Sequence, residues 1–156
     1  MKTELIAVGK TVNPHIKECI ADYASRIGHY MPFSMSIIPE LKSTKNLSEE
    51  QQKKLEGELI LKQLQPTDTV VLLDEHGKSF RSIDFAKWLQ QKQAVSRRLV
   101  FVIGGPYGFS EVVYQRANEK LSLSPMTFSH QMVRLIFTEQ LYRACTIIKG
   151  EPYHHE

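Results

Sequence analysis

The sequence Leu99-Val-Phe-Val-Ile103 is an uninterrupted apolar run that leads into the glycine-rich segment Gly104-Gly-Pro-Tyr-Gly108. Thr69-Val-Val-Leu-Leu73 is a second run of the same kind, and Asp74 follows it directly. Continuous apolar runs of this length are typical of central strands in a parallel sheet, because helices cover both faces of such a sheet. The two runs therefore predict a mainly parallel sheet with central strands at 69–73 and 99–103.

The segments around these runs alternate between strand and helix patterns. Ser48 stands before Glu49 and Glu50, and a capping side chain followed by an acidic first turn predicts the start of a helix. Ser82 is expected to cap a later helix. In chain order, the predicted strands and helices cover residues 4–8, 14–26, 33–38, 49–64, 69–73, 82–89, 99–103 and 111–118. This alternation indicates an α/β fold with helices on both faces of the sheet.

The longest helical pattern runs from Gln131 to Lys149, and Gly150 and Pro152 stop it. Its apolar residues cover two faces and are Met132, Val133, Leu135, Ile136, Phe137, Leu141, Tyr142, Cys145, Ile147 and Ile148. A helix that is apolar on two faces has to be buried twice, and in so small a protein the second surface is expected to belong to another copy. We predict a homodimer through this helix, and a charged residue at position 136 or 137 is expected to produce monomers.

Length and composition restrict the class of protein. With 156 residues, 42% of them hydrophobic, the chain is expected to form one domain. No apolar run approaches the roughly 18 to 20 residues of a membrane-spanning helix, and Met1 to Leu5 lacks the features of a secretory signal, so we expect a cytoplasmic protein. Cys19 and Cys145 are the only cysteines and have no zinc-site spacing, so no metal is expected. A net charge of +3 does not by itself identify a nucleic-acid binder.

Two glycine-bearing segments, 74–77 and 104–108, are expected where ligands bind in parallel sheets, beyond the carboxyl ends of the strands. Each segment is either a tight turn or a loop that lets the backbone approach a cofactor closely. Neither a Gly-x-Gly-x-x-Gly pattern nor a Gly-Lys-Ser/Thr pattern is present, which excludes the dinucleotide fingerprint and the phosphate-binding loop of NTPases. S-adenosylmethionine fits better because it carries no phosphate.

The sequence resembles the bacterial large-subunit ribosomal RNA pseudouridine N3-methyltransferases, a family of the SPOUT class. Each matching motif is short, but together they extend over the whole chain in order. They are Ala7-Val-Gly-Lys10, Leu73-Asp74, Gly77-Lys78, Phe101-Val-Ile-Gly-Gly105, Gly108, Leu121-Ser-Leu-Ser-x-Met-Thr127, His130-Gln131, Arg134, Glu139-Gln140, Tyr142-Arg143-Ala144, Gly150 and Tyr153-His154.

The resemblance implies a C-terminal deep trefoil knot, a homodimer packed through the last helix, and S-adenosylmethionine as the methyl donor. It also implies that the substrate is a pseudouridine in a stem-loop of the large-subunit ribosomal RNA, within the assembled ribosome. The cofactor-binding residues that it implies are Leu73, Gly104, Leu123, Ser124, Pro125, Met126, Thr127 and Phe128.

Methyl transfer to N3 requires that the nitrogen lose a proton while the electrophilic methyl is held in line with it. No metal is needed for this chemistry. The residues that the resemblance offers for it are, in order of preference, His154, Tyr153, Arg143 and His130, and we expect the tail to lie beside the cofactor cleft. Each has a simpler interpretation. Arg143 is spaced for an exposed salt bridge with Glu139, His130 is a polar helix start, and a short C-terminal tail is often frayed.

Two residues depart from the family pattern. Ser129 stands where proline is expected, and a serine there is expected to cap the last helix. His155 stands where a lysine or arginine is more usual, which removes a fixed positive charge. Two other functions stay open: a non-catalytic ribosome-binding factor with the same fold, and a nucleotide-binding metabolic enzyme. The complete glycine loop and the segment 123–128 argue against the first, and the missing phosphate motifs argue against the second.

Overall fold

The computed structural model describes all 156 residues and contains a five-stranded sheet in which every strand pair is parallel. The strands are β1 (Lys2–Val8), β2 (Phe33–Ile38), β3 (Thr69–Ser79), β4 (Arg98–Ile103) and β5 (Glu119–Ser122). Their order in the sheet is β2-β1-β4-β3-β5. The predicted parallel sheet with 69–73 and 99–103 at its centre is therefore confirmed.

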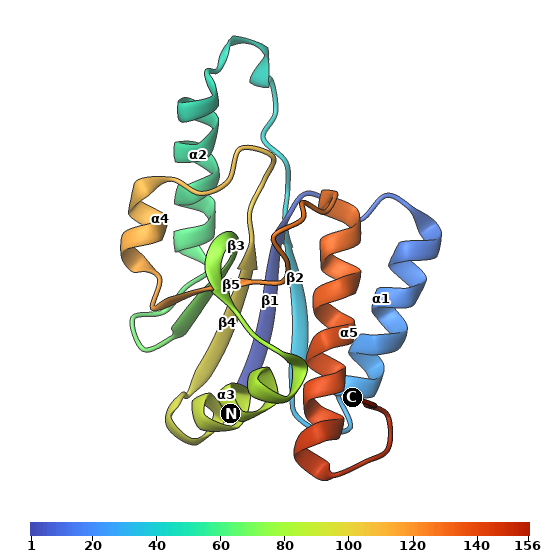
Figure 1. Cartoon of the computed structure of the whole chain (residues 1–156). Helices are drawn as coiled ribbons and strands as arrows, with labels where there is room; N and C mark the ends of the chain where they lie inside the picture. The colour runs from blue at the N-terminus through green and yellow to red at the C-terminus, as the bar shows by residue number, and fades with distance from the viewer.

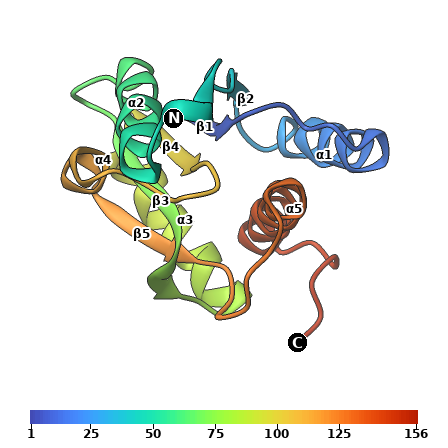
Figure 2. The same ribbon diagram turned by 90° about the horizontal axis from the view of Figure 1, so that it is seen from above.

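Helices cover both faces of this sheet, as predicted (Figure 1). They are α1 (Pro14–Ile27), α2 (Glu49–Lys62), α3 (Ser82–Val95), α4 (Glu111–Arg116) and α5 (His130–Lys149), with a short 3-10 helix at Thr44–Asn46. Alternate residues of β1 point to opposite faces: Leu5 belongs to the core with α1, α3 and α5, and Ile6 to the core with α2 and α4. Figure 2 shows α2 and α4 well separated from α1 and α5.

An aromatic cluster fixes α5 and α3 against the central strand. The ring of Phe101 in β4 lies 4.7 Å from that of Phe137 in α5 and 6.0 Å from that of Trp88 in α3, centroid to centroid. Phe101 and Phe137 are fully buried. Such pairs add to the hydrophobic stabilisation of the core, so the position of α5 relative to the strands is well defined. Phe137 is thus a core residue, and the expectation that a charge at 137 would act on a dimer surface is wrong.

Strand β3 is longer than the sequence indicates. The segment Asp74 to Gly77, predicted as either a tight turn or a loop that approaches a cofactor, is a continuation of β3. An irregularity between Leu73 and Lys78 restores the pairing with β5. A Cβ on Gly77 would lie 2.6 Å from the backbone nitrogen of Leu121, so Gly77 allows β5 to approach closely. Gly77 therefore allows two backbones to pack closely, whereas the sequence pattern fits a turn glycine equally well.

The helix starts are confirmed at α2 and corrected at α3. Ser48 and Gln51 form a reciprocal capping box at α2, with the Gln51 N–H donating to Ser48 Oγ at 3.1 Å. At α3, Arg81 occupies the N-cap position without a side-chain cap, and the prediction for Ser82 is wrong. The Ser82 hydroxyl donates instead to Gln140 Oε1 at 3.0 Å, which links α3 to α5.

Helix α5 is capped at both ends. Ser129 Oγ accepts the N–H of Met132 at 3.2 Å, which confirms the expected cap, and Gly150 ends the helix with φ of 72°. Although α5 has 20 residues, no helix in the structure combines the length and apolar character needed to cross a membrane.

Replacing Ser129 with alanine is expected to lower the free energy of unfolding by about 1 kcal/mol, because the N–H of Met132 loses its acceptor. Urea denaturation followed by circular dichroism measures this loss. Ser25→Ala, at an exposed position inside α1, is the matched control and should change stability by less than about 0.5 kcal/mol. Equal stability of the two variants would show that the Ser129 cap contributes nothing.

Candidate active site

A cavity of about 490 Å³ lies beyond the carboxyl ends of β3, β4 and β5, at the edge of the sheet where the sequence predicts a ligand. This volume falls within the range of roughly 300 to 1,000 Å³ that is common for small-molecule sites. Half of its 20 lining residues are hydrophobic. The lining comprises residues 73–76, 103–109, 114, 121, 123, 124, 126–128, 130 and 133.

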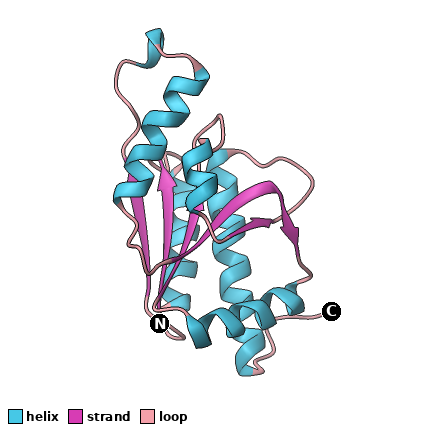
Figure 3. Cartoon of the chain, turned by 90° about the vertical axis from the view of Figure 1, so that its left-hand side faces the viewer, coloured by secondary structure: helices cyan, strands magenta, loops and turns pink.

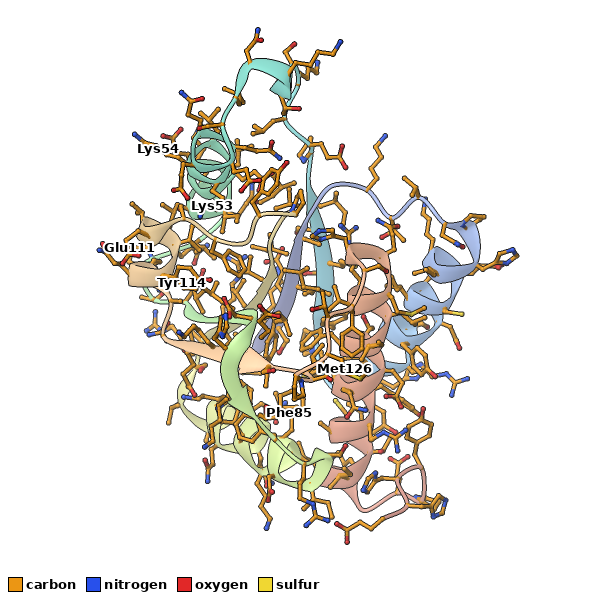
Figure 4. All side chains as sticks on the ribbon, turned by 45° about the horizontal axis from the view of Figure 1, so that its top comes forward. Lys53, Lys54, Phe85, Glu111, Tyr114 and Met126 are labelled. Carbon is orange, nitrogen blue, oxygen red and sulfur yellow. The ribbon has the colours of Figure 1, made fainter.

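The predicted cofactor-binding residues converge on this cavity. All of them except Pro125 line it, namely Leu73, Gly104, Leu123, Ser124, Met126, Thr127 and Phe128. Residues that are about 50 positions apart in the sequence are thus brought together because β3, β4 and β5 end at the same edge of the sheet. Tyr114 lies on the α4 side of the cavity and Met126 on the α5 side (Figure 4).

The glycine-rich segment after β4 is both a tight turn and a wall of the cavity. The N–H of Gly108 donates to the carbonyl of Gly105 at 3.2 Å, and Gly108 has φ of 83°. A Cβ on Gly104 would lie 3.0 Å from the ring of Phe109, so a larger side chain here has to displace that ring or enter the cavity. The interpretation of this segment as a tight turn is therefore confirmed, and its approach to a cofactor stays a prediction.

Local hydrogen bonds shape the segment between β5 and α5. The Ser122 hydroxyl donates to the carbonyl of Ser124 at 3.2 Å, and Ser124 Oγ accepts the N–H of Met126 at 3.0 Å. The Met126 side chain is 77% exposed, although it borders the cavity. An exposed thioether at a cavity rim is free to move when a ligand enters.

Two polar groups at this end of the sheet were not identified as site residues from the sequence. The Tyr114 hydroxyl donates to Asp74, which lines the cavity, and burial raises the pKa of Tyr114 well above its usual value. Arg134 is only 1% exposed and donates to the carbonyls of Val8 and Gly9 at 2.8 and 2.7 Å. Burial lowers the pKa of Arg134. Its position inside the apolar stripe of the last helix is the sequence signal that could have revealed a buried cation.

His130 is the one predicted catalytic residue at the cavity. It is the first residue of α5, and its side chain is exposed while it borders the opening. The adjacent Arg134 fixes this first turn of the helix, because Arg134 Nε also donates to the carbonyl of His130 at 3.1 Å. The turn that carries His130 is therefore held against the end of β1.

The other three predicted catalytic residues form a second cluster, named here the tail cluster, with Glu139. The Tyr153 hydroxyl donates to Glu139 Oε1 at 3.0 Å, and Arg143 Nε donates to the same oxygen at 3.1 Å. Arg143 Nη1 lies 3.2 Å from His154 Nδ1, and its guanidinium carbon lies 4.8 Å from the centre of the Tyr153 ring. Burial raises the pKa of Tyr153, and hydrogen bonds to Tyr23 and Glu139 act in the same direction.

The tail is consequently not a frayed end, and that expectation is wrong. The left-handed conformation of Gly150 turns the chain back along α5, so that Tyr153 stacks edge-on against Tyr142 at 4.7 Å between ring centroids. The interpretation of Arg143 as an exposed salt bridge is also wrong, since the side chains of Arg143 and Glu139 are only 24% and 19% exposed.

The cavity is lined by the first turn of α5 through His130 and Val133, whereas the tail cluster contacts the helix farther along, at Glu139 and Arg143. Figure 1 shows the tail after α5 folding back beside the lower part of that helix. Arg143 lies 13 positions after His130, which corresponds to about 20 Å along a helix. No residue after Val133 lines the cavity. Within one chain the tail therefore does not lie beside this cavity, and the expected placement of the tail is wrong for a single protomer.

An apolar face of α5 extends between these two clusters. Met132, Leu135 and Ile136 belong to neither core of the chain, and all three retain exposed surface. Their spacing of three and four residues places them on one side of the helix, and Glu139 and Arg143 continue the same side. We call Met132, Leu135 and Ile136 the outer face of α5.

Comparison with known proteins gives the following similarities. The model of a family described as "Predicted SPOUT methyltransferase" matches residues 1–154. Proteins named "Ribosomal RNA large subunit methyltransferase H" are similar over the full length of both chains, with 63% identity for Bacteroides thetaiotaomicron and 62% for Bacteroides fragilis. The protein of that name from Flavobacterium johnsoniae is 57% identical, again over the full length of both chains.

Proposed function

This chain belongs to the SPOUT methyltransferase family, and from that premise we propose that it methylates N3 of a pseudouridine in large-subunit ribosomal RNA with S-adenosylmethionine as donor. The observation that carries this proposal is the convergence of the glycine wall and the segment 123–128 on one cavity. The names of the full-length relatives support ribosomal RNA as the class of substrate.

The charge of the cavity supports this cofactor over a nucleotide phosphate. No lysine or arginine lines the cavity, while Asp74 and Glu75 do. A polyphosphate would meet acidic groups without a compensating cation, whereas S-adenosylmethionine carries a sulfonium and an ammonium group. The residues of the cavity therefore fit the donor, and they argue against a nucleotide-binding metabolic enzyme.

The residues that would hold the cofactor follow from the cavity walls. Gly104 leaves room beside the Phe109 ring, and Leu73, Leu123 and Phe128 contribute apolar surface for a purine ring. When bound, the donor supplies a methyl group on a positively charged sulfur. The chain itself has to orient the target nitrogen and stabilise the charge that remains when its proton leaves.

The tail cluster is suited to stabilising that negative charge. Arg143 can only donate hydrogen bonds, so the His154 Nδ1 beside it accepts, and the neutral ring of His154 then carries its proton on Nε2. Glu139 Oε1 already accepts from Tyr153 and Arg143, which leaves it poorly placed to take a further proton. The proton of N3 then passes to solvent water, and Arg143 and the Nε2–H of His154 stabilise the anionic base that attacks the methyl group.

The two halves of the site are joined in a homodimer. The outer face of α5 lies between the cavity and the tail cluster, so two antiparallel copies of α5 packed through it would bring each tail cluster toward the partner's cavity. This arrangement accounts for a separation of about 20 Å within one chain. The family also implies the deep trefoil knot, which stays a prediction.

The substrate is expected to be the assembled ribosome. A charge of +3 per chain is small for a protein that binds RNA through phosphates alone, so affinity has to draw on both protomers or on the shape of the ribosome. A non-catalytic ribosome-binding factor is the second candidate function. It is less well supported, because such a factor needs neither the glycine wall nor an ordered tail cluster.

Calorimetric titration is expected to show binding of S-adenosylmethionine and no binding of NAD or ATP. Gly104→Val should weaken binding of the donor at least about 100-fold, because a Cβ at this position already lies 3.0 Å from the Phe109 ring and the two further methyl groups enter the cavity. Val95→Ala, at an 81% exposed position at the end of α3, is the control and should bind normally. Normal affinity of a folded Gly104→Val protein would refute this placement of the donor.

A further inference from the structure

Glu56 is a buried carboxylic acid without a cationic partner. It lies in α2 and is 4% exposed. Its Oε2 accepts from Gln52 Nε2 at 3.2 Å, and its Oε1 has no hydrogen-bond partner. Buried polar atoms in proteins are nearly always paired, and a buried carboxyl with one unpaired oxygen destabilises the fold relative to an apolar side chain. Its hydrogen bonds therefore do not account for its buried position, and the packing contacts of the side chain have to be considered.

The carboxyl group of Glu56 lies directly behind the glycine wall of the cavity. A Cβ on Gly105 would collide with Glu56 Oε1 and would lie 2.8 Å from Oε2. The next residue of α2, Gly57, touches the far end of the same loop, since a Cβ there would lie 2.5 Å from Ser110 Oγ. Two consecutive residues of α2 thus support both ends of the segment 105–110, whose other side lines the cavity through Gly105 and Phe109.

The charged surroundings of Glu56 do not explain its burial as part of an ion pair. Burial raises the pKa of Glu56, and the negative charge of Glu40 raises it further. The hydrogen bond from Gln52 and the charge of His130 lower this pKa by a smaller amount. No lysine or arginine contacts it. The first part of α2 also extends beyond the sheet (Figure 3), so this helix has few other buried residues, namely Gly57 and Ile60.

We propose that Glu56 is a positioning residue of the methyltransferase: by filling the space behind Gly105 it holds the Gly104–Phe109 wall in the shape that receives the methyl donor. This inference rests on the proposed cofactor site. It assigns Glu56 no contact with substrate or donor, and its effect passes entirely through the loop. The size of the side chain, and not its charge, is the property that matters.

Variants at Glu56 separate size from charge. Glu56→Gln keeps the size and is expected to bind S-adenosylmethionine within about twofold of wild type, whereas Glu56→Ala should bind about tenfold more weakly. In the protein without donor, hydrogen exchange of the amides at 104–110 should be faster in Glu56→Ala and unchanged in Glu56→Gln. Turnover at saturating donor should change little, so the loss appears in the Michaelis constant for the donor. Glu58→Ala, at an exposed position on the same helix, is the control.

A double-mutant cycle tests the contact itself. Gly105→Ala places a methyl group against the Glu56 carboxyl and should weaken donor binding, and adding Glu56→Ala provides the space for that methyl. The double variant is therefore expected to bind more tightly than the product of the two single losses predicts. If Glu56→Ala melts below the assay temperature, Glu56→Asp replaces it and should give the same order of affinities with smaller differences.

The inference would be overturned if a folded Glu56→Ala protein bound the donor with wild-type affinity. It would also be overturned if the loss of donor affinity in the double variant equalled the product of the two single losses. Neither result would affect the proposed function. Failure of the wild-type protein to bind S-adenosylmethionine would instead refute the proposed function, and the inference with it. A tenfold loss in Glu56→Gln equal to that in Glu56→Ala would show that charge matters and would also overturn it.

Discussion

Deleting Tyr153 to Glu156 is expected to lower the rate of methyl transfer to ribosomes at least about 100-fold while the affinity for S-adenosylmethionine changes by less than about twofold. The deletion removes His154 and Tyr153 from the tail cluster and leaves Arg143 without its ring contact. None of the deleted residues lines the cavity or belongs to a core of the chain. The deletion should therefore slow methyl transfer without changing donor binding or the fold.

Three measurements check this result: single-turnover methylation of ribosomes, calorimetry with the donor, and thermal melting. Glu156→Ala is the control, because it removes only the exposed salt bridge with Arg81, and such pairs contribute little. His154→Ala alone should lower turnover more than it raises the apparent Michaelis constant for ribosomes. If the truncated protein methylates ribosomes at the wild-type rate, the tail has no catalytic part, and Arg143 or His130 becomes the better candidate.

Replacing Ile136 with glutamate is expected to produce monomers that bind the donor but do not methylate ribosomes. Ile136 lies on the outer face of α5, outside both cores, so the substitution should leave the fold of one chain intact. A carboxylate without a partner inside an interface costs several kcal/mol, which raises the dissociation constant of the dimer by about three orders of magnitude or more. Light scattering at micromolar concentration measures the state of association. Val95→Glu, at an exposed position in α3, is the matched control.

A wild-type protein that is monomeric at micromolar concentration would contradict the dimer. A mixing experiment tests whether the site is shared. Gly104→Val chains lack the cofactor site, and chains cut before Tyr153 lack the tail, so each is expected to be inactive alone. If each site combines one chain's cavity with the other chain's tail, about half of the dimers in an equimolar mixture are heterodimers and each of these carries one complete site, so activity should recover to about a quarter of wild type. No recovery would show that each site is built within one chain.

The sequence predicts the sheet well because its central strands are covered on both sides. Burial on two faces requires continuous apolar runs, and the runs at 69–73 and 99–103 have the length of strands and are too short for typical helices. The convergence of Gly104 with the segment 123–128 also follows, since the carboxyl ends of parallel strands share one edge. The family resemblance identified residues 123–128 as cofactor-binding candidates, and the strand pattern predicted that ligands bind at this edge of the sheet.

What the sequence missed depends on contacts that local patterns do not encode. The pattern around Gly77 fits a turn, but Gly77 in fact lets β3 approach the backbone of Leu121 closely. Both roles require a residue without a side chain, so the sequence alone does not distinguish them. The burial of Glu56 was not predicted, since a carboxylate in a helix is usually solvated. The packing of Tyr153 against Tyr142 depends on the return of the chain after Gly150, which a helix-stop signal indicates without giving its direction.

Helix α5 fixes the distance between two groups of the proposed site, because it begins at His130 and carries Arg143, the partner of His154, farther along. One residue inserted between Ile136 and Glu139 would turn everything after it by about 100° and advance it by about 1.5 Å. Glu139 and Arg143 would then leave the side of the helix that holds Met132 and Ile136. Insertions and deletions in this stretch are therefore expected to disrupt the site whichever residue is added or removed. Changes in chain length are instead expected in segments such as the 3-10 turn at Thr44–Asn46, which fixes no distance between functional groups.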